Sequence, residues 1–224
     1  MGAITGPDGL PRCGWALAAP DYVRYHDTEW GVPVRTDSGL LERIVLEGFQ
    51  AGLSWLTILR KREAFRSALA GFDPPALAAF TADDVQRLLR DASIVRHRRK
   101  IEAAVGNAQA LVALQRRDGP DALTRLVWAH APADHARPLR TCDVPASTPE
   151  SAALAVALRR EGFVFVGPTT AYAAMQACGV VDDHLAGCAF GRGSGEDGPR
   201  LWDNGTSIGT QKGCAHGGNE AADR

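Results

Sequence analysis

The stretch that decides the fold class runs over residues 81–100 and reads TADDVQRLLRDASIVRHRRK. Thr81 and Asp84 stand at the spacing of a capping box, which predicts that a helix begins here. We expect a tight turn over residues 92–95 and a second helix that starts at Arg98. Two helices joined by so short a turn pack against each other, which favours an all-α fold.

The same stretch is locally basic. One acid, Asp91, stands among six basic residues, which are Arg87, Arg90, Arg96, Arg98, Arg99 and Lys100. A helix start presents free backbone N–H groups, and these groups beside positive charge make a phosphate site. Most charged runs are only solvated faces, and two helices around a turn make contact with DNA an equally open interpretation.

Helical patterns dominate the rest of the chain. Thr148 before Pro149 starts a helix that Gly162 ends. Further helices are predicted over residues 38–49, 54–69, 98–115 and 168–178, and only residues 163–166 look like a strand. We therefore predict an all-α domain of roughly eight to ten helices.

Composition limits the class of protein. The 224 residues are 45% hydrophobic and 23% charged, as in an ordinary globular domain, and the net charge is −1. A protein that coats nucleic acid non-specifically would be basic overall. No apolar run reaches the roughly 18 residues of a membrane span, and no secretory signal opens the chain, so cytoplasmic residence is expected.

The composition changes at both ends of the chain. Residues 191–224 hold nine of the 24 glycines and few apolar residues. Such a segment cannot bury enough apolar surface to offset its loss of entropy, so a disordered tail is predicted. Residues 1–11 look similar and are predicted to be flexible, which leaves residues 12–190 as the folded domain.

Two cysteines and two histidines stand near the ends of that domain, namely Cys13, His26, His184 and Cys188. A Cys2His2 set makes a closed tetrahedral Zn²⁺ site, which would be structural. His184 and Cys188 would lie on one face if their segment were helical. The alternative is four ordinary residues, because cysteine also packs as a small hydrophobe. The spacing alone does not decide between them.

Aromatic residues are dense near the start of the domain. Four of them fall within 16 residues and a fifth follows, in the order Trp15, Tyr22, Tyr25, Trp30 and Trp55. Tyrosine and tryptophan combine an apolar face with a hydrogen-bonding group, so together they suit a pocket for a flat ligand. A plain hydrophobic core is the alternative for any one of them.

Glu47 stands in an otherwise apolar run over residues 44–49. A carboxylate in a core is costly unless it is paired or used. Its angular position on the predicted helix also allows a solvent-facing side chain, so the pattern leaves both options open.

These elements occur together in one known family. The chain closely resembles the bacterial DNA-3-methyladenine glycosylase I family, within the helix-hairpin-helix DNA glycosylase superfamily. The resemblance covers residues 12–190 and rests on RCGW at 12–15, YHDTEWG at 25–31, LEGFQAGLSW at 46–55, IVRHR at 94–98, FVGPTT at 165–170, MQACG at 175–179 and DHLAGC at 183–188.

The resemblance implies a fold and a set of site residues. The fold is a helix-hairpin-helix glycosylase globule, with the hairpin at about residues 84–114 and one structural Zn²⁺ per chain. The implied zinc ligands are Cys13, His26, His184 and Cys188; the base pocket is Trp15, Tyr22, Tyr25, Trp30 and Trp55 with Glu47 as its carboxylate. The implied DNA contacts are Gly52, Leu53, Ser93, Arg96, Arg98 and Lys100.

The implied activity is base-excision repair of double-stranded DNA. The cationic 3-methyladenine would be flipped into the pocket, and hydrolysis of its N-glycosidic bond would release the free base and leave an abasic site. We expect Glu47 to read the base first and to support the transition state second. With Lys100 as a phosphate contact and not a Schiff-base nucleophile, a monofunctional enzyme is expected, by default a monomer.

One departure and two other hypotheses remain. Ser93 stands where the superfamily usually has glycine in the hairpin turn, so a strained or altered turn with altered DNA affinity is expected. A zinc-stapled DNA-binding module without catalysis would also explain the hairpin and the Cys/His set, though not Glu47. A zinc hydrolase would need an open coordination position, which two cysteines and two histidines do not leave.

Overall fold

Most of the chain is helical in the computed structural model, which describes residues 1–191. The helices are η1 (Gly14–Ala18), α1 (Pro20–Thr28), α2 (Asp37–Gln50), α3 (Trp55–Ala68), η2 (Ala70–Phe72), α4 (Pro74–Ala78), α5 (Ala82–Arg90), α6 (Arg98–Asp118), α7 (Ala122–Trp128), η3 (Thr141–Asp143), α8 (Pro149–Arg160) and α9 (Pro168–Ala177). The prediction of an all-α fold is confirmed. Apart from Gly191, the predicted tail lies outside the described residues.

Local signals in the sequence start the helices where predicted. The Thr81 hydroxyl accepts the N–H of Asp84 and the Asp84 carboxylate accepts the N–H of Thr81, which completes the capping box of α5. Thr148 caps α8 in the same way. Residues 163–166 are a loop and not a strand, because the Asn107 side chain binds both the N–H and the carbonyl of Val164.

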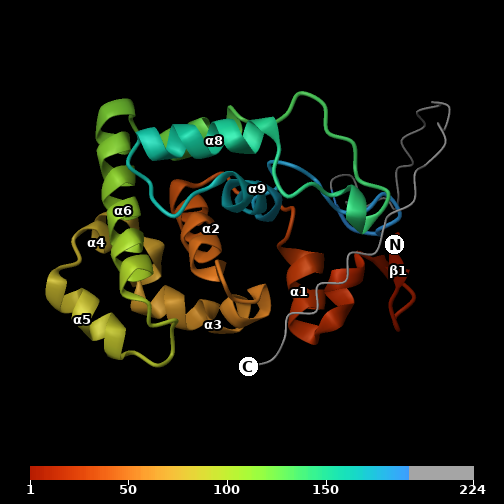
Figure 1. Cartoon of the computed structure of the whole chain (residues 1–224), viewed down its shortest axis with the longest axis horizontal. Helices are drawn as coiled ribbons and strands as arrows, with labels where there is room; N and C mark the ends of the chain where they lie inside the picture. Colours follow the sequence, from red (N-terminus) through yellow and green to blue (C-terminus); the bar gives the residue numbers. More distant parts are fainter. Residues whose placement is uncertain (192–224) are drawn as a thin grey trace.

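Helix α2 is the centre of the molecule. It packs against α3, α6, α7 and α9, with α8 lying across α9 and α4 against α6 (Figure 1). Its apolar residues, such as Leu41 and Phe49, are fully buried in one hydrophobic core. We call the helices α2 to α9 the helical body. None of the helices within residues 1–191 has the length and apolar character needed to cross a membrane.

The first residues form a short hairpin where a flexible segment was predicted. Strands β1 (Ile4–Thr5) and β2 (Pro11–Arg12) pair antiparallel, and Gly9 takes the positive φ of 82° that the turn between them needs. The Arg12 guanidinium is buried and binds the carboxylates of Asp8 and Asp27. Ion pairs therefore order this segment. The prediction of flexibility considered only the small number of apolar residues and could not detect them.

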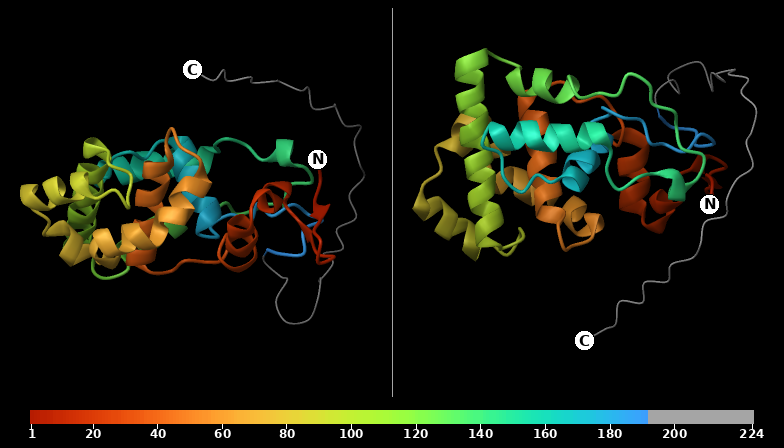
Figure 2. Two further views of the ribbon diagram at one scale, coloured as in Figure 1. Left: turned by 90° about the horizontal axis from the view of Figure 1, so that it is seen from below. Right: turned by 45° about the horizontal axis from the view of Figure 1, so that its top comes forward.

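The two ends of the described chain lie side by side. The N–H of Ala189 donates to Pro11 O at 2.8 Å, and the N–H of Leu185 donates to Cys13 Sγ at 3.3 Å. Figures 1 and 2 show this junction at one side of the molecule, next to α1 and away from α4 and α6. The fold therefore has a helical body and a terminal junction, with α1 between them.

Candidate functional site

A cavity of about 440 Å³ opens between the helical body and the terminal junction. Helices α1, α2 and α9, the start of α3 and the segment after α7 contribute to its walls. All five aromatic residues singled out in the sequence line this cavity together with Glu47; they are Trp15, Tyr22, Tyr25, Trp30 and Trp55. The cavity is large enough for a purine base and has mostly apolar walls.

The aromatic rings support one another. The Trp15 ring lies edge-on to Tyr22 and Trp30, with centroid distances of 5.6 Å and 5.1 Å. The Tyr25 and Trp55 rings are 5.6 Å apart and tilted by 49°. The Tyr22 hydroxyl also accepts the N–H of Leu56, which ties α1 to the first turn of α3. The walls are therefore held in place before any ligand enters.

Glu47 is buried in the cavity wall, with 7% of its surface exposed. The alternative of a solvent-facing carboxylate is therefore excluded by the fold. Among residues 1–191 the Glu47 carboxyl has no hydrogen-bond or ion-pair partner. Burial raises the pKa of Glu47 to about 8, and the nearby Arg43 charge limits that rise. A carboxyl with this pKa is mostly protonated at pH 7.

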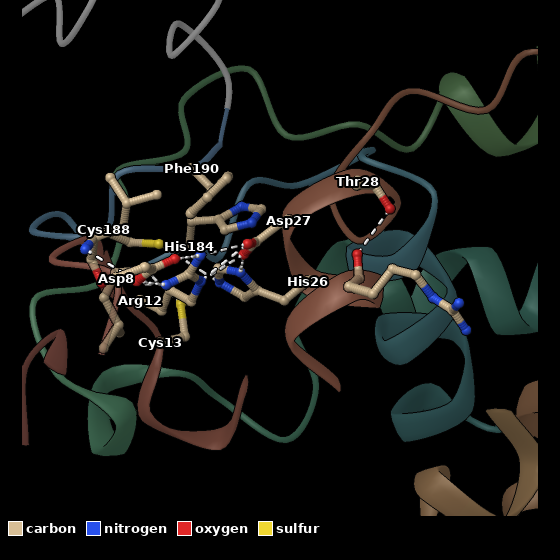
Figure 3. A network of polar contacts seen from close by, with 12 residues as sticks. Asp8, Arg12, Cys13, His26, Asp27, Thr28, His184, Cys188 and Phe190 are labelled. Carbon is tan, nitrogen blue, oxygen red and sulfur yellow. Dashed lines mark hydrogen bonds and ion pairs between the residues drawn. The ribbon is translucent and has the colours of Figure 1, made fainter. Parts of the chain in front are cut away.

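The cysteines and histidines gather beside the cavity (Figure 3). Ligand atoms of Cys13, His26 and Cys188 lie within 4.8 Å of one another, and Cys188 Sγ is 3.5 Å from His26 Nε2. The His184 ring lies 4.8 Å from the His26 ring, centroid to centroid. The segment from His184 to Cys188 is a turn and not a helix, and the N–H of Cys188 donates to Leu185 O.

The donor set of this cluster fits a metal ion. His26 Nδ1 lies 2.8 Å from Asp27 and His184 Nδ1 lies 2.8 Å from Asp182, so each ring is oriented by a carboxylate, as in metal sites. His184 Nε2 is buried with no hydrogen-bond partner among the described residues. An orphaned buried nitrogen is costly unless something binds it.

The two thiols of this cluster differ in acidity. The contact between the two thiols lowers the pKa of Cys188, with help from His26, and raises the pKa of Cys13. Thiolate sulfur and imidazole nitrogen are the ligands that Zn²⁺ prefers. The described residues thus contain a cluster that could hold a metal ion.

The loop after α2 carries an exposed apolar tip. Gly52 adopts a positive φ of 86°, with open space where a side chain would stand. This conformation turns the chain, and Leu53 is left 42% exposed just before Ser54 caps α3. The implied DNA contact at Gly52 and Leu53 is accordingly a surface feature.

The basic turn lies between α5 and α6, and Ser93, Arg96 and Arg98 are all exposed there. The strain expected at Ser93 is absent, because Ser93 is not among the non-glycine residues with positive φ in residues 1–191. Its N–H and its hydroxyl both donate to the Asp91 carboxylate, and Lys61 Nζ donates to its carbonyl. Serine therefore forms a relaxed turn closed by its own side-chain contacts.

Lys100 differs from the other basic residues of the turn. Its side chain is buried, and Nζ donates to Phe49 O at 2.9 Å and to Ala51 O at 2.6 Å. These carbonyls end α2, where the helix leaves acceptors unsatisfied. The structure thus corrects the expected phosphate contact: Lys100 joins the start of α6 to the end of α2, and burial lowers its pKa.

Four polar residues of the cavity wall were not singled out in the sequence, namely Gln50, Thr141, Gln176 and Asp183. Gln176 on α9 and Asp183 beyond it line the wall, and Gln176 Nε2 donates to Asp183 Oδ2 at 2.6 Å. Asp183 is 4% exposed. Its carboxylate also accepts a hydrogen bond from the Tyr172 hydroxyl and contacts His135 Nε2. The sequence signal was one polar residue in an apolar helical stretch, which by itself does not identify a site.

Comparison with known proteins matches this architecture. A model of the methyladenine glycosylase family matches residues 15–191. DNA-3-methyladenine glycosylase 1 of Escherichia coli (strain K12) is 46% identical over 182 residues, which cover 80% of this chain and 96% of that protein. The relative from Haemophilus influenzae is 44% identical over 181 residues, covering 79% and 96%.

Solved structures agree with these relatives. The 3-methyladenine DNA glycosylase I of Staphylococcus aureus, studied for its recognition of 3-methyladenine, superposes with a TM-score of 0.74 at 34% identity, covering 79% of this chain and 94% of that one. A structure of a 3-methyladenine DNA glycosylase I in complex with 3-methyladenine superposes with a TM-score of 0.75 at 32% identity. The match covers 84% of this chain and 99% of that one. The chain described here belongs to the methyladenine glycosylase family.

Proposed function

We propose that the protein is a DNA-3-methyladenine glycosylase of base-excision repair. It hydrolyses the N-glycosidic bond of 3-methyladenine in double-stranded DNA, releases the free base and leaves an abasic site. The observation that carries the proposal is the buried Glu47 carboxyl, which faces an aromatic cavity without a partner. Such a group is costly to the fold and gains a partner when a cationic base enters.

The cavity selects the damaged base through charge. A base inside a duplex is out of reach, so it must be flipped into the cavity. Methylation at N3 leaves the base cationic within DNA, and a desolvated cation gains about 2 kcal/mol over an aromatic face. The faces of Tyr25 and Trp55 serve this role. Neutral adenine lacks that gain.

The protonation of Glu47 is coupled to the same selection. Opposite charges about 4 Å apart attract by about 4 kcal/mol at an effective dielectric constant near 20. The cationic base therefore pulls the pKa of Glu47 down from about 8 and converts the carboxyl to carboxylate. A neutral base leaves Glu47 protonated and gives no such stabilisation.

The chemical step needs little acid catalysis. The bond between C1′ of deoxyribose and the base nitrogen breaks, and its electron pair neutralises the cationic base. A water oxygen then bonds to C1′ and loses a proton to solvent. The ionised Glu47 stabilises the positive charge that passes from the base to the sugar.

The same geometry favours a monofunctional enzyme. A lyase step needs a lysine amine that is free to form a Schiff base with the sugar. Lys100 Nζ instead binds the two carbonyls at the end of α2. We expect no covalent adduct when the protein is incubated with damaged DNA and sodium borohydride, and a trapped cross-link would contradict the monofunctional assignment.

Double-stranded DNA is the proposed partner, bound by a monomer. Helices α5 and α6 with the turn between them serve as a helix-hairpin-helix, in which Ser93, Arg96 and Arg98 contact phosphate. Gly52 and Leu53 approach the gap left by the flipped base. This assignment is supported by the exposure of all five residues and excludes Lys100.

One structural Zn²⁺ is proposed at the junction, held by Cys13, His26, His184 and Cys188. The ion supplies a cross-link between the ends of residues 12–190, the glycosylase domain. The orphaned His184 Nε2 and the Cys13–His26–Cys188 cluster support this set. Two sulfur and two nitrogen ligands leave no position for substrate, so the zinc hydrolase hypothesis is disfavoured.

The test is base release from methylated duplex DNA in the absence of added metal. Free bases are separated by HPLC, and DNA binding is measured in parallel on an unmodified duplex of the same sequence. The proposal predicts that 3-methyladenine appears with the protein and not with buffer. A folded protein that binds both duplexes but releases no base would instead support the DNA-binding module. A cytoplasmic location is expected for this role.

A further inference from the structure

The wall of the cavity contributed by α9 ends in a fixed pair of polar side chains. Gln176 Nε2 lies 2.6 Å from Asp183 Oδ2. Asp183 is nearly fully buried and is held in turn by the Tyr172 hydroxyl at 2.6 Å and by His135 Nε2 at 2.8 Å. Two side chains of α9 and His135 from the segment after α7 therefore fix the position of one carboxylate.

This contact determines which end of the Gln176 amide is left without a partner. An ionised carboxylate only accepts hydrogen bonds, so the NH₂ group of Gln176 must point at Asp183. The carbonyl oxygen Oε1 then points away from Asp183. It has no hydrogen-bond partner among residues 1–191 and is not enclosed by protein. Gln176 thus lines the cavity with its Oε1 left as the free acceptor of the amide.

The wall formed by α2 carries another polar group that has no hydrogen-bond partner among residues 1–191, the Glu47 carboxyl. Helices α2 and α9 pack against each other, and Glu47 and Gln176 both line the cavity between them. A flat base held by the aromatic rings would meet Glu47 from one helix and Gln176 from the other. Two polar groups on different helices can read two positions on the edge of one base.

We propose that Gln176 is a specificity-determining residue, whose Oε1 accepts a hydrogen bond from the exocyclic amino group of 3-methyladenine. The inference rests on the proposed function. The purine 3-methylguanine carries a carbonyl oxygen at that place, which would face Oε1 as a second acceptor. A site built to pair with one polar group rejects the analogue that lacks it, because its own group stays unpaired. Asp183 acts as a positioning residue that prevents the amide from turning round.

The experiment compares two products of one reaction. Methylated duplex DNA that contains both 3-methyladenine and 3-methylguanine is incubated with excess protein, and the release rate of each free base is measured by HPLC. Gln176→Met keeps the length and volume of the side chain and removes the acceptor. We expect 3-methyladenine release to fall about tenfold, with 3-methylguanine release unchanged or faster.

A matched control removes an amide elsewhere. Gln109 on α6 also donates through Nε2 to an acceptor, Ala78 O, but does not line this cavity. Gln109→Met is expected to keep the ratio of the two release rates within about twofold of wild type. Gln176→Asn, whose shorter amide cannot reach both Asp183 and the base, serves as the second variant and should lower the ratio.

The ratio separates a specific role from a structural one. Partial unfolding lowers both rates by the same factor and leaves their ratio unchanged. If the ratio of 3-methyladenine to 3-methylguanine release in Gln176→Met stays within about twofold of the wild-type ratio, the inference is overturned while the proposed function stands. A wild-type protein that releases no 3-methyladenine would overturn both.

Discussion

The helical body and the terminal junction are stabilised in different ways. The body buries a continuous set of aliphatic and aromatic side chains around α2, such as Leu41, Phe49 and Phe65. The junction has only a small apolar cluster around Cys13, Leu185 and Cys188, and relies on ion pairs and on the Cys–His cluster. The cavity lies between the two and takes walls from both. Its shape therefore depends on a junction with little hydrophobic stability of its own.

The largest expected effect comes from breaking the junction alone. Cys188→Ala removes a proposed zinc ligand and should lower the free energy of unfolding by roughly 3–5 kcal/mol, with loss of bound Zn²⁺ and of base release. Far-UV circular dichroism should keep most of its helical signal, because the body does not contain the cluster. Zinc content and thermal melts check this.

Cys178→Ala is the matched control for that variant. Cys178 is also buried but belongs to the core of the body. It should keep bound zinc and cost about 1 kcal/mol. Equal zinc content in both variants would contradict the ligand assignment.

The opposite experiment breaks the body and spares the junction. Phe65→Ala removes a fully buried ring that lies 4.6 Å from Phe49 and should lower the free energy of unfolding by about 3–5 kcal/mol. The folded variant should still bind one Zn²⁺, as measured by metal analysis after gel filtration. Loss of zinc from a folded variant would show that the two regions are not separable.

A smaller change in the free energy of unfolding is expected when Glu47, which lines the cavity between the two regions, is replaced. Its pKa in the folded protein is about 8, above the value near 4.3 of an unfolded chain. The folded state therefore binds the extra proton, and wild-type stability falls as pH rises between these two values. Glu47→Gln should gain up to about 2–5 kcal/mol over wild type by pH 8 and much less at pH 5.

Glu42 on the same helix provides the control. It is buried to a similar degree but accepts from Arg66, so Glu42→Gln should lower stability and not raise it. Chemical denaturation from pH 5 to 8 measures both variants. A gain for Glu47→Gln that does not grow with pH would contradict the burial of an unpaired carboxyl.

The smallest effect concerns the salt dependence of DNA binding. Lys100→Met should destabilise the fold by about 1–3 kcal/mol, since it leaves the buried Phe49 carbonyl and the partly buried Ala51 carbonyl without this donor. It should keep the salt slope of DNA affinity. Arg96→Ala should keep the fold and reduce the slope by about one. A reduced slope for Lys100→Met would restore the phosphate contact.

The sequence predicted the body better than the junction for a physical reason. Caps such as Thr81 and Thr148 and the apolar periodicity act within one turn, so the helices could be located from neighbouring residues. The burial of Glu47 depends on how α9 and α1 pack against α2, which no local pattern contains. Lys100 belongs to a basic run in the sequence, and only the packing of α6 on α2 turns it inward.

The Cys and His residues of the junction were recognised because their side chains are typical zinc ligands, and not from their spacing in the sequence. Cys13 and His26 lie about 160 residues before His184 and Cys188, and the latter pair stands on a turn. The hairpin over residues 1–12 was missed because its order comes from Arg12 and two carboxylates. Gln176 and Asp183 were missed because their contact joins α9 to a turn beyond it.

The most direct test of the account is the single-turnover rate of 3-methyladenine release by wild type and Glu47→Gln at pH 7, with affinity for methylated duplex DNA measured on the same samples. The account predicts that the variant keeps its DNA affinity within about threefold and loses roughly 100-fold or more in release rate, because a neutral amide cannot stabilise the cationic base and sugar. Equal release rates would contradict the role of Glu47 while leaving the glycosylase assignment in place.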